Sequence, residues 1–146
     1  MRIAIGADHA GFTLKARLTE RLRASGHEVD DLGPSSAESV DYPDYAAAVA
    51  GSVAQGDVNL GVLVCGTGLG MAIAANKIPG VRAVTCSETF SARMARLHND
   101  ANVLTLGSRV IGEGLALDVL QVFLDTEFEG GRHQRRVEKI DALSTF

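Results

Sequence analysis

The sequence lacks the many cysteines, the excess of positive charge and the long apolar runs that are typical of disulfide-rich, nucleic-acid-binding and membrane proteins, respectively. Its 146 residues include no tryptophan and two cysteines, Cys65 and Cys86, which form no CxxC pair. Neither a disulfide scaffold nor a structural zinc site is therefore indicated. The formal net charge of -4 argues against a general nucleic-acid binder. No apolar run is long enough to cross a membrane and no leader follows Met1, so we expect a soluble, cytoplasmic protein with no membrane or nucleic-acid partner.

Short β-rich runs alternate with longer segments of helical periodicity. The predicted strands are 2–7, 27–31, 60–64, 81–85 and 103–106, and the predicted helices are 12–24, 42–55, 69–77, 88–97 and 113–127. Such a series of βα units predicts a parallel sheet covered by helices. We expect residues 1–146 to form one α/β domain, a doubly wound, Rossmann-like, five-stranded parallel sheet with helices on both faces. A long loop opening at Gly33-Pro34 is placed to cover a site.

The run from Val62 to Gly70 carries the strongest local signal. An apolar strand delivers Cys65 into a glycine-rich turn, and a helix is predicted to start near Gly68. Glycines let a ligand approach the backbone, and a helix start directs free N–H groups to the same place. A thiol there should ionise more readily than a buried one. The alternative is that Cys65 only closes the strand as a small core residue.

Ligands of an open parallel sheet bind beyond the carboxyl ends of its strands, so the residues after each predicted strand are candidates. Asp8 and His9 follow the first strand and either cap the next helix or bind a ligand and handle a proton. Arg109 follows the fifth strand. His98 and Asn99 end the fourth predicted helix, where a histidine can also simply interact with the helix dipole.

An anionic small ligand is a further expectation, because arginine far outnumbers lysine. Arg132 and Arg136 are four residues apart, so on a helix they share one face and can hold one phosphate. The alternative is a solvated basic face.

Nucleotide and metal sites are not favoured. The segment 6–11 has the outer glycine spacing of a P-loop, but Phe12 stands where its lysine belongs. The segment 66–70 does not match GxGxxG, although its amides can hold a smaller oxyanion. A metal site built from His9, His98 and His133 lacks HxH or HExxH spacing.

Taken together, these segments resemble the ribose-5-phosphate isomerase B family, also called RpiB/LacAB, over nearly the whole chain. The segments that carry the resemblance are GADHAG at 6–11, DYPDY at 41–45, CGTGLG at 65–70, AANK at 74–77, RLHNDAN at 96–102, LGSR at 106–109, and 131–136.

The resemblance implies a cofactor-free and metal-free enzyme that interconverts an aldose phosphate and its ketose isomer. It implies a homodimer or tetramer with active sites at the subunit interface, where we expect the C-terminal segment, about 128–146, to pack. Cys65 would be the base that moves the proton between C2 and C1, His98 would assist ring opening, and Thr67 would help stabilise the enediolate. The implied substrate-binding residues are Asp8, His9, Tyr42, Gly66, Gly68, Leu69, Gly70, Asn99, Arg109, Arg132 and Arg136.

The sugar is less well determined, because family members act on ribose 5-phosphate, allose 6-phosphate, galactose 6-phosphate or four-carbon sugar phosphates. We favour ribose 5-phosphate, since this one polypeptide carries the full catalytic set, whereas the galactose-type enzyme is built from two different subunits. Cys65 places the chain in the group that uses a cysteine rather than a carboxylate as the base. A non-catalytic sugar-phosphate or nucleotide-binding module on the same sheet is the alternative.

Overall fold

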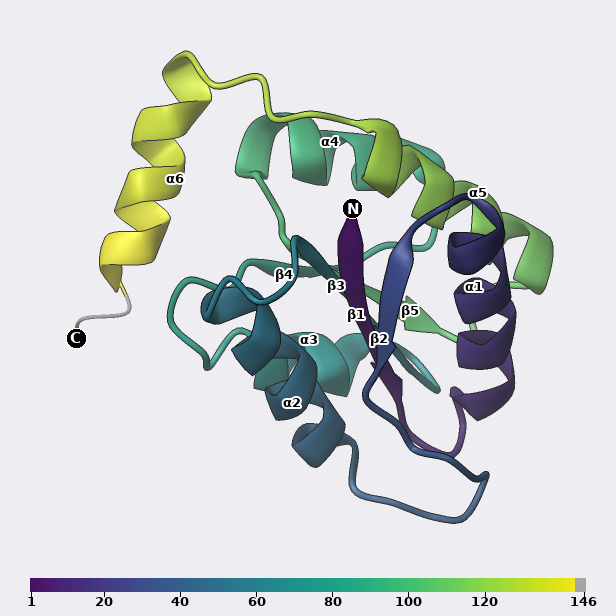
Figure 1. The fold of residues 1–146 in the computed structure, drawn as a ribbon. Coiled ribbons are helices and arrows are strands. Elements are labelled where there is room, and N and C mark those ends of the chain that lie inside the picture. The colour runs from purple at the N-terminus through teal and green to yellow at the C-terminus, as the bar shows by residue number, and fades with distance from the viewer. Residues whose placement is uncertain (144–146) are drawn as a thin grey trace.

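Strands and helices alternate along the chain, as predicted, in a computed structural model that describes residues 1–143 (Figure 1). The strands are β1 (Arg2–Ala7), β2 (Glu28–Asp31), β3 (Leu60–Cys65), β4 (Ala83–Thr85) and β5 (Val103–Gly107). The helices are α1 (Phe12–Ala24), α2 (Tyr42–Ala54), α3 (Leu69–Ala75), α4 (Thr89–Asn99), α5 (Glu113–Asp125) and α6 (Arg132–Ala142). The predicted elements are confirmed with ends that differ by no more than two residues, and α6 is an additional helix that the pattern did not predict.

The five strands form one parallel sheet in the order β2-β1-β3-β5-β4. From β1 the chain proceeds outward to β2 and then crosses to the other side of β1 to form β3. The direction of winding therefore reverses between β1 and β3, and α/β proteins bind ligands beyond the carboxyl ends of the strands at such a point. Asp8 and Cys65 lie at this point, because they stand at the carboxyl ends of β1 and β3.

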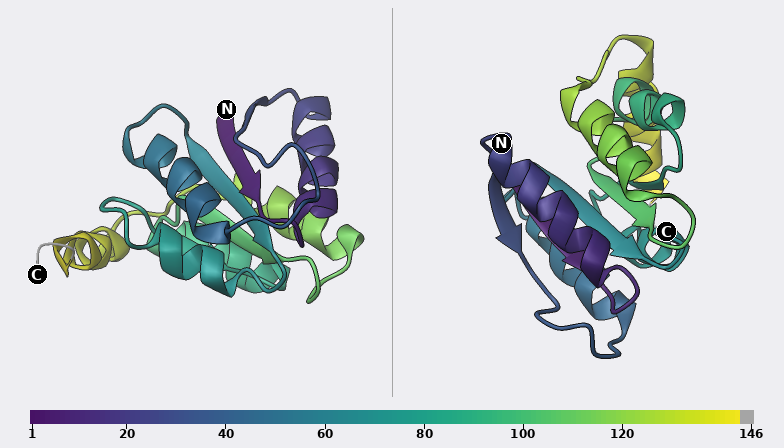
Figure 2. Two further views of the ribbon diagram at one scale, coloured as in Figure 1. Left: turned by 90° about the horizontal axis from the view of Figure 1, so that it is seen from below. Right: turned by 90° about the vertical axis from the view of Figure 1, so that its right-hand side faces the viewer.

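Helices cover both faces of the sheet, as predicted. On one face, α1, α4 and α5 pack on the strands through a core that includes Leu18, Leu104 and Phe123. On the other face, α2 and α3 pack through a core that includes Val49, Leu63 and Met71 (Figure 2). Strands β1, β3 and β5 are buried on both faces and read as continuous apolar runs, which is why they could be identified from the sequence.

Helix α6 extends away from the sheet (Figures 1 and 2). It buries only His133 and Val137, so its sequence carries a weak apolar pattern and gave no helix prediction. Its end is fixed by Asp141, whose two carboxylate oxygens each accept a hydrogen bond from Arg82 at 3.1 Å. Because Arg82 directly precedes β4, this ion pair ties α6 to the amino edge of the sheet.

Candidate functional site

The first group of predicted site residues meets at the carboxyl edge of the sheet, where β1 and β3 end. The Asp8 backbone N–H donates to the Val64 carbonyl at 3.1 Å, so the turn after β1 lies against the end of β3. The Asp8 side chain is buried and accepts a hydrogen bond from the Gly11 N–H at 3.0 Å. A β-carbon on Gly11 would lie 2.3 Å from the Val64 carbonyl oxygen, so only glycine permits this approach. The structure thereby brings Asp8 and Cys65 to adjacent strand ends.

The turn after β3 wraps around the Cys65 thiol. The Gly68 N–H donates to Cys65 Sγ at 3.1 Å and orients the sulfur. Gly68 has a φ of 79°, a left-handed conformation that favours glycine, and α3 starts at the next residue, as predicted. The Gly68 carbonyl accepts hydrogen bonds from the hydroxyls of Thr85 and Thr105, which anchor the turn to β4 and β5. Thr67 itself is exposed, with its Oγ1 accepting from the Leu69 N–H at 3.2 Å.

Two further predicted residues contact this turn. The Tyr42 ring at the start of α2 lies directly on Gly70, where a β-carbon would be 2.7 Å from ring atoms. The Arg109 guanidinium lies over Gly66, where a β-carbon would be 3.4 Å from Nη1. Arg109 is exposed, and within residues 1–143 no carboxylate forms an ion pair with it. An aromatic ring and an unpaired cation therefore flank the Cys65 turn.

The long loop after β2 lies beyond the same edge of the sheet (Figure 1). His9 holds it from one side, since its Nδ1 accepts a hydrogen bond from the Val40 N–H at 3.3 Å. Lys15 holds it from the other side. Its buried ammonium lies 2.6 Å from Asp31 Oδ1 and donates to the Pro34 carbonyl at 3.1 Å. The role of Lys15 in holding this loop was not predicted, because its partners Asp31 and Pro34 are distant in sequence and no local pattern indicates the contact.

The second group of predicted site residues lies at the opposite, amino edge. Helix α4 starts beyond the end of β4 and runs back across the sheet, so His98 and Asn99 at its end lie near the start of β5. Arg132 and Arg136 are on α6, both are exposed, and no ion pair joins either to a carboxylate among the described residues. A five-residue strand spans about 16 Å, so one chain cannot bring His98 and Cys65 to the same substrate.

Two side chains that sequence analysis did not place in the site surround His98. The His133 ring stacks on the His98 ring, with centroids 4.2 Å apart and 13° between the planes. Glu129 Oε2 lies 3.5 Å from His133 Nε2 and 3.9 Å from His98 Nε2. Burial, together with the nearby His98 and Arg132, lowers the pKa of His133. His133 is thus neutral near pH 7.

This group is also where metal-ligand atoms converge within the described part of the chain. His98, Glu129 and His133 each offer one possible metal-ligand atom, and these three atoms lie within 4.8 Å of one another. A zinc ion is bound by nitrogen lone pairs that point at one centre. The rings of His98 and His133 are stacked and nearly parallel, so the lone pairs of their nitrogens run side by side and do not converge. One ring would have to leave the stack to share an ion, so the arrangement does not fit a preformed metal site.

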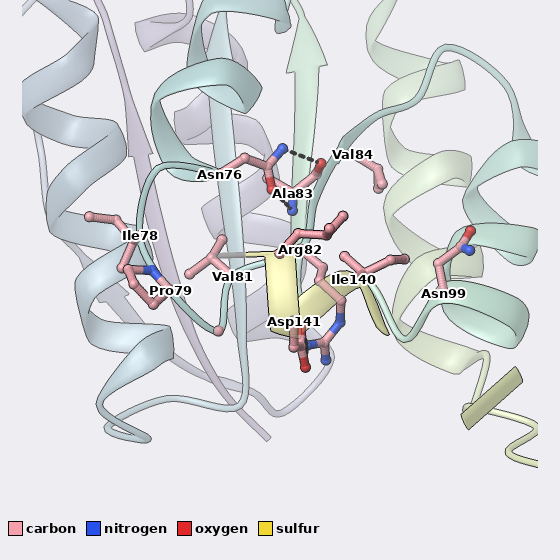
Figure 3. Close-up of a pocket in the computed structure, with 12 residues that line it drawn as sticks. Asn76, Ile78, Pro79, Val81, Arg82, Ala83, Val84, Asn99, Ile140 and Asp141 are labelled. Atoms are coloured by element: carbon pink, nitrogen blue, oxygen red, sulfur yellow. Dashed lines mark hydrogen bonds and ion pairs between the residues drawn. The ribbon is translucent and has the colours of Figure 1, made fainter. Parts of the chain in front are cut away.

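A cavity of about 500 Å³ opens at the amino edge, between the residues before β4 and the end of α6 (Figure 3). Ile78, Val81 and Ile140 give it apolar walls, and Arg82 and Asp141 pair beside them. Of the predicted site residues, only Asn99 lines it. The cavity is therefore distinct from the Cys65 turn.

The second thiol, Cys86, has different surroundings. It is buried in the core on the α1, α4 and α5 face. Burial and the nearby Glu88 carboxylate raise its pKa to about 11, which keeps it protonated and unreactive near pH 7. Cys65 is also buried, but in the core of the opposite face, and it lies at the end of β3 in the glycine turn that Tyr42 and Arg109 contact.

Comparison with known proteins identifies the family to which the chain belongs. The sequence model of the family described as Ribose/Galactose Isomerase matches residues 3–140. Ribose-5-phosphate isomerase B of Escherichia coli is 53% identical over 142 residues, which are 97% of this chain and 95% of that protein. No helix among residues 1–143 is long and apolar enough to span a membrane.

Solved structures of similar proteins share the fold over nearly the whole chain. Ribose-5-phosphate isomerase B of Clostridium thermocellum superposes with a TM-score of 0.98 at 50% identity, covering 99% of this chain and 98% of that one. The Mycoplasma genitalium enzyme, solved with bound ribulose-5-phosphate, gives a TM-score of 0.95 at 43% identity, covering 99% of this chain and 96% of that one. The chain therefore belongs to the Ribose/Galactose Isomerase family and is an isomerase.

Proposed function

We propose that this chain interconverts ribose 5-phosphate and ribulose 5-phosphate, and that two copies jointly form each active site. The observation that carries the proposal is the division of the predicted site between opposite edges of the sheet. Cys65, Thr67 and Asp8 lie at the carboxyl edge, whereas His98 and Arg132 lie at the amino edge. The chemistry needs both groups on one substrate, and a twofold-symmetric pair can bring the carboxyl edge of each copy to the amino edge of the other.

Exposed apolar side chains flank both groups. Leu69 and Ile73 on α3, next to the Cys65 turn, are 57% and 66% exposed. Ile140 and Leu143, at the end of the chain that carries the arginines, are 45% and 62% exposed. Exposed apolar surface beside a functional group supports a protein interface. This supports a homodimer in which α6, within the predicted interface segment 128–146, packs on the partner.

In the proposed reaction, the Cys65 thiolate removes the proton from C2 of the open-chain aldose. The electron pair forms the C1–C2 double bond, and the C1 carbonyl oxygen becomes an enediolate oxygen. The Thr67 hydroxyl and those N–H groups of the segment 66–70 that do not donate within the turn stabilise this charge as preorganised donors, since the N–H groups of Gly68 and Leu69 bond Cys65 Sγ and Thr67 Oγ1. The thiol then returns the proton to C1, and the hydroxyl proton on O2 passes to O1, which gives the ketose. No electrons leave the sugar, so the reaction needs no redox cofactor.

The remaining residues bind the substrate. Asp8, His9 and Asn99 are assigned to the sugar hydroxyls, and Tyr42 flanks the sugar. Arg109, Arg132 and Arg136 are assigned to the phosphate, since arginine binds phosphate through paired N–H groups. The full-length similarity to ribose-5-phosphate isomerase B, and the ribulose-5-phosphate bound in the M. genitalium structure, support a five-carbon substrate.

The shared site can be tested by complementation. Cys65→Ala and the double variant Arg132→Ala/Arg136→Ala are each expected to be inactive as homodimers. Co-expressed with different affinity tags and purified as a mixed dimer, they regain one intact site, so we expect about half of the wild-type activity. Proton NMR of ribose 5-phosphate in D₂O with EDTA measures both ribulose 5-phosphate and loss of the C2 proton.

A matched pair of variants gives the control. In a mixed dimer of one Cys65→Ala chain and one Thr67→Ala chain, both substitutions lie in the carboxyl-edge half of a site. Each of the two sites then contains one of the substitutions, so we expect the mixed dimer to stay inactive. Failure of the first mixed dimer to regain activity would show that the two groups do not share a site across the interface. Failure of the wild-type protein to convert ribose 5-phosphate would instead reject this sugar.

His98 is expected to govern ring opening. Ribose 5-phosphate is mostly a closed furanose, whereas proton transfer from C2 needs the open aldehyde. The initial rate of His98→Asn should therefore stop rising with enzyme concentration once spontaneous ring opening limits turnover, while the wild-type rate stays proportional. A proportional rate for His98→Asn at every enzyme concentration would contradict the assignment.

A further inference from the structure

The stacked pair of His98 and His133 has an outer and an inner ring. The side chain of His98 is 36% exposed, whereas His133 is 5% exposed and lies behind it. The rings are nearly parallel, 13° apart, with centroids at 4.2 Å. A flat buried ring that backs a partly exposed one restricts how the outer ring can turn.

The inner ring is itself firmly placed. The Glu129 N–H donates to the Leu97 carbonyl at 3.0 Å, which fixes the segment before α6 to the end of α4. The His133 N–H donates to the Gly130 carbonyl at 3.0 Å within the first turn of α6. His133 and Val137 then form the buried face of this helix. These bonds fix the backbone of His133 relative to the end of α4, and burial confines its ring.

Packing alone does not explain a histidine at this position. His133 Nε2 is buried and has no hydrogen-bond partner among the described residues. A buried polar atom without a partner lowers the free energy of unfolding, a loss that an apolar side chain of similar size would avoid. Glu129 is the one carboxylate near this nitrogen, at 3.5 Å, and it is itself half exposed. The unpartnered nitrogen of His133 therefore destabilises the fold. What the histidine supplies in exchange is a flat ring behind His98.

We propose that His133 is a positioning residue for the isomerase reaction, whose buried ring holds the His98 imidazole by stacking in the orientation that meets the sugar. The inference rests on the proposed function, in which His98 touches the substrate. Stacked aromatic pairs stabilise their relative orientation beyond the effect of burial alone. A small misplacement of a reacting group costs far more, up to about 100-fold in rate.

Two variants separate stacking from packing. His133→Phe keeps a flat ring behind His98, and His133→Leu fills the space without one. We expect His133→Leu to lower kcat/KM for ribose 5-phosphate by about 10-fold to 100-fold and to show the levelling of rate at high enzyme concentration expected for His98→Asn. His133→Phe should recover most of this loss. The Ki of inorganic phosphate, which reports on Arg132 and Arg136, should stay the same in both variants.

Three results would overturn the inference. Equal losses in the two variants would show that stacking is not what matters. A raised Ki for phosphate in His133→Leu would show that α6 as a whole has shifted. A rate for His133→Leu that stays proportional to enzyme concentration would show that His98 is unaffected. Inactivity of the wild-type protein on ribose 5-phosphate would instead reject the proposed function.

Discussion

Cys65→Ala is expected to lose turnover while keeping the fold. The substitution removes the only atom that can take the C2 proton in the proposed reaction, and a positioned base contributes about 10²-fold to 10⁴-fold to such a step. The loss of one buried sulfur atom should cost about 1 kcal/mol of unfolding free energy, because the side chain is small. Proton NMR in D₂O should show neither ketose nor loss of the C2 proton, and circular dichroism should show an unchanged fold.

Cys86→Ala is the matched control for this substitution. It also removes a buried thiol, but one in the core on the opposite face of the sheet, and it should leave activity at the wild-type level. Because burial and Glu88 raise the pKa of Cys86 to about 11, we expect alkylation near neutral pH to act at Cys65 and to inactivate Cys86→Ala and the wild type alike. Near-normal activity of Cys65→Ala would remove Cys65 from the role of base and require another proton acceptor in the carboxyl-edge group.

The carboxyl-edge group could be predicted because its determinants are local in sequence. A buried apolar strand, a cysteine and a glycine turn are contiguous from Val62 to Gly70, and the structure confirms the strand end within one residue and the start of α3. The left-handed conformation of Gly68 between them is a finding of the structure. The role of Gly70 was less visible. It accommodates the ring of Tyr42, a contact between segments far apart in the chain.

The division of the site was implicit in the order of elements. A helix that follows one parallel strand and precedes another must end at the amino edge of the sheet, so His98 belongs away from Cys65. Sequence analysis grouped them because the family pattern combines their roles. The stack of His98 on His133 could not be predicted, because it depends on how α6 packs, and α6 has only one buried apolar residue, Val137, to reveal it.

Arg132→Ala is expected to weaken phosphate binding strongly. A hydrogen bond to a charged group is worth about 1.5–3 kcal/mol, which corresponds to a roughly 10-fold to 100-fold rise in KM. The exposed Arg132 has no carboxylate partner among the described residues, so its fork is free for a ligand. Arg132→Lys should restore only part of the affinity, because an ammonium lacks the paired geometry. Initial rates over a range of ribose 5-phosphate concentrations, and the Ki of inorganic phosphate, give both effects.

Arg135→Ala supplies a control of equal charge on the same helix. Steps of about 100° per residue place Arg135 opposite the face that buries His133 and Val137, whereas Arg132 and Arg136 lie beside one another nearer to that face. Loss of Arg135 should therefore leave KM near its wild-type value. If Arg132→Ala and Arg135→Ala raised KM alike, α6 would act only through its overall positive charge. An unchanged KM in Arg132→Ala would remove this residue from the phosphate site, and Arg109 and Arg136 would have to hold the phosphate between them.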